Sequence, residues 1–214
     1  MNYDDISWAQ ARKKMTESAV AALKAHGYQV ERIPERGRSS NWNFIHEGKK
    51  GKLCIRTSND RWFAFINEND GWKTLDDMDM VVVVAVDNPN DPTQFHTFLF
   101  SAEEVRQSFN DSRKARIESG MTVKEGYGMW IGLDESLEER PLFIGSGLAK
   151  KYPPIAIDPI FTEIEKDANQ HKKLTAPNTN VDSIADIIEN AKSLISQKMG
   201  ISKDQISLDL KFDF

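Results

Sequence analysis

The run from Met80 to Val86, MVVVVAV, constrains the fold of this chain more than any other stretch. It contains no polar residue and has the length of one β-strand. A continuous apolar run of this length suits a strand that is buried on both faces, with helices covering the sheet. We therefore expect a sheet with this segment at its centre and the rest of the chain packed around it.

Short runs rich in aromatic and β-branched residues come before this segment, separated by clusters of Asn, Asp, Gly and Lys. This pattern predicts three consecutive strands joined by hairpins, at Phe44–Ile45, Lys52–Arg56 and Trp62–Ile66. Strands are also expected at Tyr28–Ile33, Phe95–Phe100, Met129–Leu133 and Pro141–Gly145. The segment Phe95–Phe100 should close a hairpin with the apolar run.

Two amphipathic helices are expected to flank this sheet. In Ser7–His26 the apolar residues recur at spacings of three and four, and Gly27 follows as a C-terminal glycine. The sequence Ser101-Ala-Glu-Glu104 has the form of a capping box and predicts a helix that reaches Ser112 or Ile117. The expected fold class is thus α/β, a mixed central sheet of about five core strands flanked by helices.

Residues 1–150 are predicted to form this core, and residues 151–214 a C-terminal helix–strand extension. Helices are expected at Asp158–Asn169 and Val181–Met199, on either side of a polar linker at His171–Asn180. The last segment, Ile206–Phe214, alternates apolar and polar residues and predicts a half-buried strand. Because one helix and one strand are too small to fold alone, the extension should dock on the core, on a second copy of the chain or on a partner protein.

The composition excludes several classes of protein. The single cysteine, Cys54, rules out an internal disulfide framework and a cysteine-rich zinc site. No apolar stretch approaches the roughly 18 residues that span a membrane. The first residues, MNYDDISWAQARKK, lack the apolar region of a secretory signal. A cytoplasmic protein without membrane association is the expectation.

Charge is distributed unevenly along the chain, although the net charge is only −5. Ala11–Arg56 contains 11 Lys and Arg against 4 Asp and Glu, a local charge of +7, whereas Thr57–Phe100 has a local charge of −6. A basic region beside an acidic one is compatible with a nucleic-acid-binding face. Solvated faces of alternating sign would give the same counts.

A family resemblance is carried by Thr16–Val30, where Thr-Glu is followed by Ala-Val-x-x-Leu-x-x-x-Gly-Tyr-x-Val and then by a strand, a hairpin and a strand. This pattern resembles the PD-(D/E)XK, or restriction-endonuclease-like, nuclease superfamily. The segment Asp76–Val105 is similar to it as well, so the resemblance covers roughly residues 7–133. In that family an Asp and a Glu hold Mg²⁺, and a Lys supports the nucleophile or the developing charge.

The matching positions carry other residues here, apart from Glu17 on the first helix. Asn43 stands in place of the Asp, Cys54 in place of the Glu or Gln, and Arg56 in place of the Lys. Asn is a neutral ligand, Cys is a soft one, and Arg does not lose its proton. The resemblance therefore implies a restriction-endonuclease-like fold with a degenerate active site, no metal and no cofactor.

Our first hypothesis is a catalytically inactive module that binds nucleic acid, with DNA as the expected form, or a partner in a defence, repair or mobile-element system. Lys and Arg would supply sequence-independent affinity that falls with salt. The predicted phosphate contacts are Arg36, Arg38, Asn43, Lys52, Arg56, Arg113, Lys114 and Arg116.

Two alternatives stay open. The chain would be an active Mg²⁺-dependent nuclease if Glu47, beside His46, or Asp60 supplied the missing carboxylate. It would be a non-enzymatic interaction or accessory protein if the C-terminal helix and strand were its assembly surface. Convergence of Glu17, Asn43, Cys54 and Arg56 on one concave site would support the superfamily assignment.

Overall fold

The computed structural model of this chain describes Tyr3 and residues 6–34, 40–138 and 140–161, and, in the C-terminal part, residues 188–189, 191–193, 195–196 and 202–207. The chain divides into two compact units, Asn2–Ile160 and Phe161–Phe214 with Met1. The larger unit extends past residue 150, where the sequence placed the end of the core, because a further strand pairs with its sheet at Ala156–Pro159.

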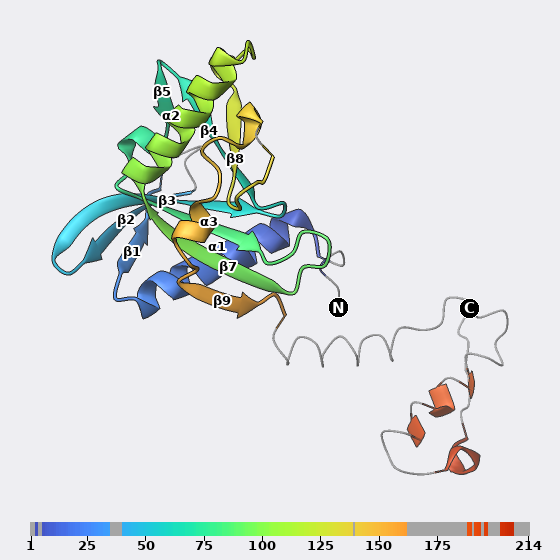
Figure 1. Cartoon of the computed structure of the whole chain (residues 1–214). Helices are drawn as coiled ribbons and strands as arrows, with labels where there is room; N and C mark the ends of the chain where they lie inside the picture. Colours follow the sequence, from blue (N-terminus) through green and yellow to red (C-terminus); the bar gives the residue numbers. More distant parts are fainter. Residues whose placement is uncertain are drawn as a thin grey trace, which may run out of the picture. The chain divides into compact units, whose positions relative to one another are not determined.

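Six strands form the main sheet of this unit, in the order β1-β2-β3-β6-β7-β9 (Figure 1). Neighbouring strands are antiparallel except β3 and β6, which are parallel. The apolar run is β6, and Val81–Val86 are buried between β3 and β7, so the prediction of a central strand covered on both faces is confirmed. The strands span β1 Gln29–Arg32, β2 Asn41–His46, β3 Lys49–Ser58, β6 Met80–Val86, β7 Gln94–Ser101 and β9 Ala156–Pro159.

The prediction that a hairpin joins Lys52–Arg56 to Trp62–Ile66 is wrong. The next strand, β4 (Trp62–Glu68), belongs to a separate three-stranded sheet with β5 (Gly71–Lys73) and β8 (Gly128–Gly132). Between β3 and β4, the carboxylate of Asp60 accepts hydrogen bonds from Ser58 Oγ at 3.0 Å and from the N–H of Trp62 at 3.1 Å. Arg61 there has a φ of 62°, in the left-handed region. This tight turn directs the chain out of the main sheet.

The two predicted helices cover opposite faces of the main sheet (Figure 1). Helix α1 (Trp8–Ala25) is capped by Ser7 in a capping box with Gln10, and it lies against β1, β3, β6 and β7. Helix α2 (Ala102–Glu118) is capped by Ser101, whose Oγ accepts the N–H of Glu104 at 3.2 Å. Helix α2 and the small sheet pack on the face that α1 leaves uncovered.

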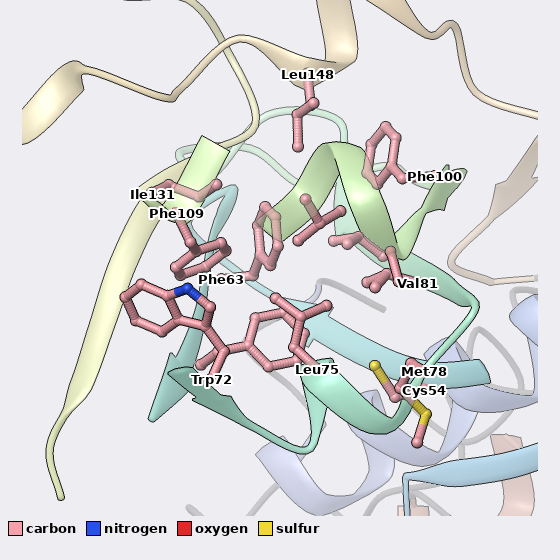
Figure 2. Close-up of a cluster of buried hydrophobic side chains, with 14 of the residues drawn as sticks. Cys54, Phe63, Trp72, Leu75, Met78, Val81, Phe100, Phe109, Ile131 and Leu148 are labelled. Atoms are coloured by element: carbon pink, nitrogen blue, oxygen red, sulfur yellow. The ribbon is translucent and has the colours of Figure 1, made fainter. Parts of the chain in front are cut away.

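An aromatic cluster joins α2 to both sheets (Figure 2). The ring of Phe109 on α2 lies 5.5 Å from Phe63, 5.3 Å from Phe65 and 5.1 Å from Trp72, measured between ring centroids. Tilted and edge-on pairs at these distances are favourable beyond the area that they bury. The same cluster includes Cys54 of β3 and the β6 side chains of that face, so the two sheets share one core.

Two further predictions need correction. Pro141–Gly145 is not a strand: Pro141–Phe143 form the 3-10 helix η3, with the proline at its start. Proline suits a helix start because its φ is already fixed and the N–H that it lacks would have no partner there. Asp158, the predicted start of a helix, lies in β9, and residues 162–169 of that helix fall outside the described residues. Shorter elements are η2 (Leu75–Asp77) and α3 (Leu148–Lys151).

In the smaller unit, the described residues between Val181 and Met199 are helical, as the apolar stripe predicts. The 3-10 helix η4 (Lys203–Gln205) follows, and Ile206 and Ser207 after it are not in a strand. The remainder of the predicted strand and the predicted linker lie outside the described residues. Among the described helices, none has the length and apolar character that crossing a membrane requires.

Candidate nucleic-acid interface

The four positions that the resemblance singled out do not converge. Side chains alternate along a strand, and on β3 Ile55 and Thr57 face the same groove as Glu17. Cys54 and Arg56 therefore point to the opposite face, where Cys54 is buried in the core and the Arg56 guanidinium lies 4.4 Å from the ring centroid of Phe65.

Asn43 belongs to the face of Cys54 as well. The register of β2 and β3 pairs Asn41 with Cys54 and Asn43 with Lys52, and paired residues share a face of the sheet. The structure thus brings Asn43, Cys54 and Arg56 to one face and leaves Glu17 on the other.

Cys54 and Glu17 lie in very different environments. Burial raises the pKa of the Cys54 thiol to about 11, although the positive charge of Arg56 acts in the other direction. The Glu17 side chain is 64% exposed, with its carboxylate 3.9 Å from Lys13 Nζ. Within the described ranges, no three His, Cys, Asp or Glu side chains are grouped so that they could hold a metal ion.

The carboxylates of the shifted-site alternative lie in turns. Glu47 is in the tight β2–β3 turn with a φ of 48°. The carboxylate of Asp60 accepts hydrogen bonds from Ser58 Oγ and from the N–H of Trp62. Neither residue lines the groove that contains Glu17.

That groove is the candidate site, and we call it the α1 groove. Its volume is about 480 Å³, and it lies between α1 and the strands β1, β2 and β3. Helical periodicity turns Ala9, Arg12, Lys13 and Thr16 to one side, next to the stripe that packs on the sheet. The groove is lined by Ala9, Arg12, Lys13, Thr16, Glu17, Arg32, Ser40, Trp42, Ile55 and Thr57.

The α1 groove is predominantly basic. Arg12 and Lys13 of α1 and Arg32 of β1 contribute three positive charges, against the single carboxylate of Glu17. The indole Nε1 of Trp42 is buried and has no hydrogen-bond acceptor among the described residues. Guanidinium and ammonium groups beside an aromatic side chain can bind phosphates and a planar base.

The groove also carries hydroxyl groups that belong to local hydrogen bonds. Thr16 Oγ1 donates to the carbonyl of Arg12 at 2.8 Å, and Ser40 Oγ accepts from Arg56 Nη1 at 3.0 Å. Arg56 thus contacts one residue of the groove, although it is not part of the groove lining.

Two of the other predicted phosphate contacts, Arg113 and Arg116, make hydrogen bonds within the protein. Arg113 donates through Nη1 to Asn67 Oδ1 at 3.2 Å and to the carbonyl of Asp70 at 2.8 Å, and Arg116 donates to the carbonyl of Trp130 at 2.6 Å. Both arginines thereby tie α2 to the small sheet. The remaining positions are Lys114, 3.9 Å from Glu118; Lys52, exposed on β3; and Arg36 and Arg38, outside the described residues.

Arg12, Lys13, Arg32 and Trp42 were not among the predicted site residues. The basic segment Ala11–Arg56 contains all four, so its charge was the available signal. The sequence alone did not show that residues of α1 and β1, about 20 positions apart in the chain, would line one groove.

Comparison of the chain with protein-family models, with curated proteins and with solved structures found no match in any of the three.

Proposed function

We propose that this protein binds nucleic acid through the α1 groove and does not cleave it. The observation that carries the proposal is that Arg12, Lys13 and Arg32 line one groove together with Trp42. Because the cations come from a helix and from a strand, they border the groove from two elements, which suits an extended polyanion better than a small ion. Lys and Arg contacts to phosphates position nucleic acid without reading its sequence.

Trp42 supports a role for bases as well as phosphates. Stacking of a base on an aromatic side chain tolerates any sequence, because every base has a π-face. Ile55 beside it adds an apolar surface to the same groove.

The placement of the side chains supports binding without cleavage. Mg²⁺ is usually bound through one or two carboxylates together with substrate phosphates. On the face of Glu17, β3 presents Ile55 and Thr57, which carry no negative charge. Kinship with the restriction-endonuclease-like superfamily stays part of this proposal, supported by the order α1, β1, β2, β3, whereas the side chains of the predicted site do not support it.

The test of binding is the double substitution Arg12→Ala/Arg32→Ala, followed by fluorescence anisotropy with labelled single-stranded and duplex DNA. We expect at least about tenfold weaker binding near 50 mM salt. The slope of log K against log salt should become shallower by about 1.4 for single-stranded and about 1.8 for duplex DNA, because two phosphate contacts are lost.

A matched control removes the same charge elsewhere: Lys114→Ala/Lys150→Ala, at side chains that are 75% and 71% exposed. This variant should retain the affinity and the salt slope of the wild type. Equal affinities of wild type and Arg12→Ala/Arg32→Ala, or an equal loss in the control, would refute the α1 groove as the binding site.

The proposal also predicts that the wild-type protein leaves plasmid and single-stranded DNA intact in the presence of Mg²⁺ or Mn²⁺. Gel electrophoresis after prolonged incubation measures this directly. Metal-dependent cleavage that disappears in Glu17→Gln would show that the groove is a nuclease site and would contradict the proposal.

A further inference from the structure

A second pocket lies at the C-terminal end of α2, and we call it the α2-end pocket. It is formed by the last turn of α2, the following connection and the start of β8, and its volume is about 190 Å³. One water molecule occupies about 30 Å³ in the liquid, so the pocket has room for a carboxylate and a small apolar group. Its lining residues are Arg116, Met121, Thr122, Val123, Lys124, Tyr127, Gly128 and Met129.

Arg116 is a half-buried cation without an anionic partner in the described part of the chain. Its Nη2 donates to the carbonyl of Trp130 at 2.6 Å, while its Nε is buried without an acceptor. Arg61, by contrast, binds Asp134 with two hydrogen bonds, and Arg106 binds Glu103. Burial lowers the pKa of Arg116, because desolvation disfavours its charged form. An anion in the pocket would offset that cost.

Apolar side chains form the remainder of the pocket. Met129 is buried, Met121 is 40% exposed and Tyr127 is 65% exposed. Ile117, next to Arg116 on α2, is 58% exposed. Exposed apolar side chains that surround a pocket are typical of sites that bind another protein.

The surrounding charges favour one carboxylate over a polyanion. Two glutamates are close in sequence to the lining residues: Glu118 is 3.9 Å from Lys114, and Glu125 accepts the N–H of Asn69 at 3.1 Å. These carboxylates would repel the several phosphates of a nucleic acid more strongly than they would repel a single carboxylate. The backbone carbonyls at the end of α2 already accept hydrogen bonds within the chain. The carbonyl of Ala115 accepts from Ser119, that of Arg116 from Met121 and that of Ile117 from Gly120.

We infer that the α2-end pocket binds a partner protein through a short segment in which a carboxylate stands beside an apolar side chain. The carboxylate would bind Arg116 and Lys124, as charge-assisted hydrogen bonds to guanidinium and ammonium groups are strong. The apolar side chain would pack on Met121, Tyr127 and Met129. This inference is independent of the α1 groove, which lies on the other side of the main sheet.

The probe is a display library of random twelve-residue peptides, selected on the full chain. Enriched peptides should contain Asp or Glu beside Leu, Ile, Met or Phe. For a synthetic copy of an enriched peptide, replacement of the acid by its amide should weaken binding at least tenfold, measured by fluorescence anisotropy. Lys124→Glu and Tyr127→Ser, both at exposed positions, should each weaken binding of the original peptide at least tenfold.

Lys114→Ala, two residues from Arg116 on the same helix, is the control and should bind like the wild type, as should Arg12→Ala/Arg32→Ala. The inference is overturned if no acidic–apolar peptide is enriched, if the amide copy binds equally well, or if Lys124→Glu and Tyr127→Ser leave binding unchanged. If Lys124→Glu and Tyr127→Ser lose oligonucleotide binding but retain peptide binding, the pocket binds nucleic acid. That result would also overturn the inference.

Discussion

Replacing Cys54 by glutamate should destabilise the protein by several kcal/mol at neutral pH, enough to unfold a large fraction of it. Cys54 is fully buried in the cluster that joins the two sheets (Figure 2). A larger carboxyl group there would overpack the core and would be removed from water. Because folded domains are stable by only about 5–15 kcal/mol, this loss is a large share of the total. Urea unfolding followed by tryptophan fluorescence measures it.

The destabilisation by Cys54→Glu should depend on pH. The apolar core raises the pKa of the new carboxyl group above the value of about 4.3 in the unfolded chain. Below pH 4.3 both states are protonated, so ionisation costs nothing. As pH rises above that value the unfolded chain releases the proton first, and stability falls by up to about 1.4 kcal/mol per pH unit until the folded pKa is reached. The loss relative to wild type should therefore be larger at pH 8 than at pH 5.

Cys54→Ala is the matched control, because it removes the thiol without adding a charge. It should cost about 1 kcal/mol at either pH. If Cys54 instead faced the groove of Glu17, as the nuclease alignment required, glutamate there would be solvated and tolerated. A Cys54→Glu protein as stable as Cys54→Ala at pH 8 would thus contradict the placement of β3 side chains described above.

The second large effect is expected from Phe109→Ala, which should reduce the free energy of unfolding by about 3–5 kcal/mol. Phe109 is fully buried and lies among the rings of Phe63, Phe65 and Trp72. Truncation would leave a cavity where α2 meets the small sheet. The neighbouring bond from Trp72 Nε1 to Asn110 Oδ1, at 2.9 Å, would lose its packing support.

Phe109→Leu keeps most of the volume and should cost about 1.5 kcal/mol or less. Chemical denaturation of both variants gives the comparison. Amide hydrogen exchange should localise the weakening of Phe109→Ala to α2, β4 and β8 before the main sheet. Equal losses for Ala and Leu, or faster exchange in β6 than in β4, would show that the aromatic cluster does not hold the small sheet in place.

The sequence by itself determined the elements whose signals are local. The apolar run of β6, the stripe of α1 and the serine cap of α2 each depend on residues within one turn or strand, and each is found where predicted. The hairpin of β6 and β7 is also local, because only a short polar turn separates the two strands.

The tertiary structure determined which side chains of a strand point to which face of the sheet. It also determined which strands pair with one another. Side chains alternate with a period of two, so an alignment shifted by one residue moves every side chain to the other face. The nuclease alignment grouped Cys54 and Arg56 with Glu17, whereas in the structure it is Ile55 and Thr57 that face Glu17. The β3 sequence does not distinguish these two orientations of its side chains, because both faces of that strand are largely covered.

Long-range contacts decided the remainder. Strand β4 left the main sheet for a sheet with β8, and Arg61 at its start binds Asp134, which is 73 residues away in the chain. The α1 groove likewise exists only where α1 crosses the strands, and that crossing is set by the burial of the helix's apolar stripe on the sheet. The sequence determined that Arg12, Lys13 and Arg32 are basic, and packing between distant segments determined that they line one groove.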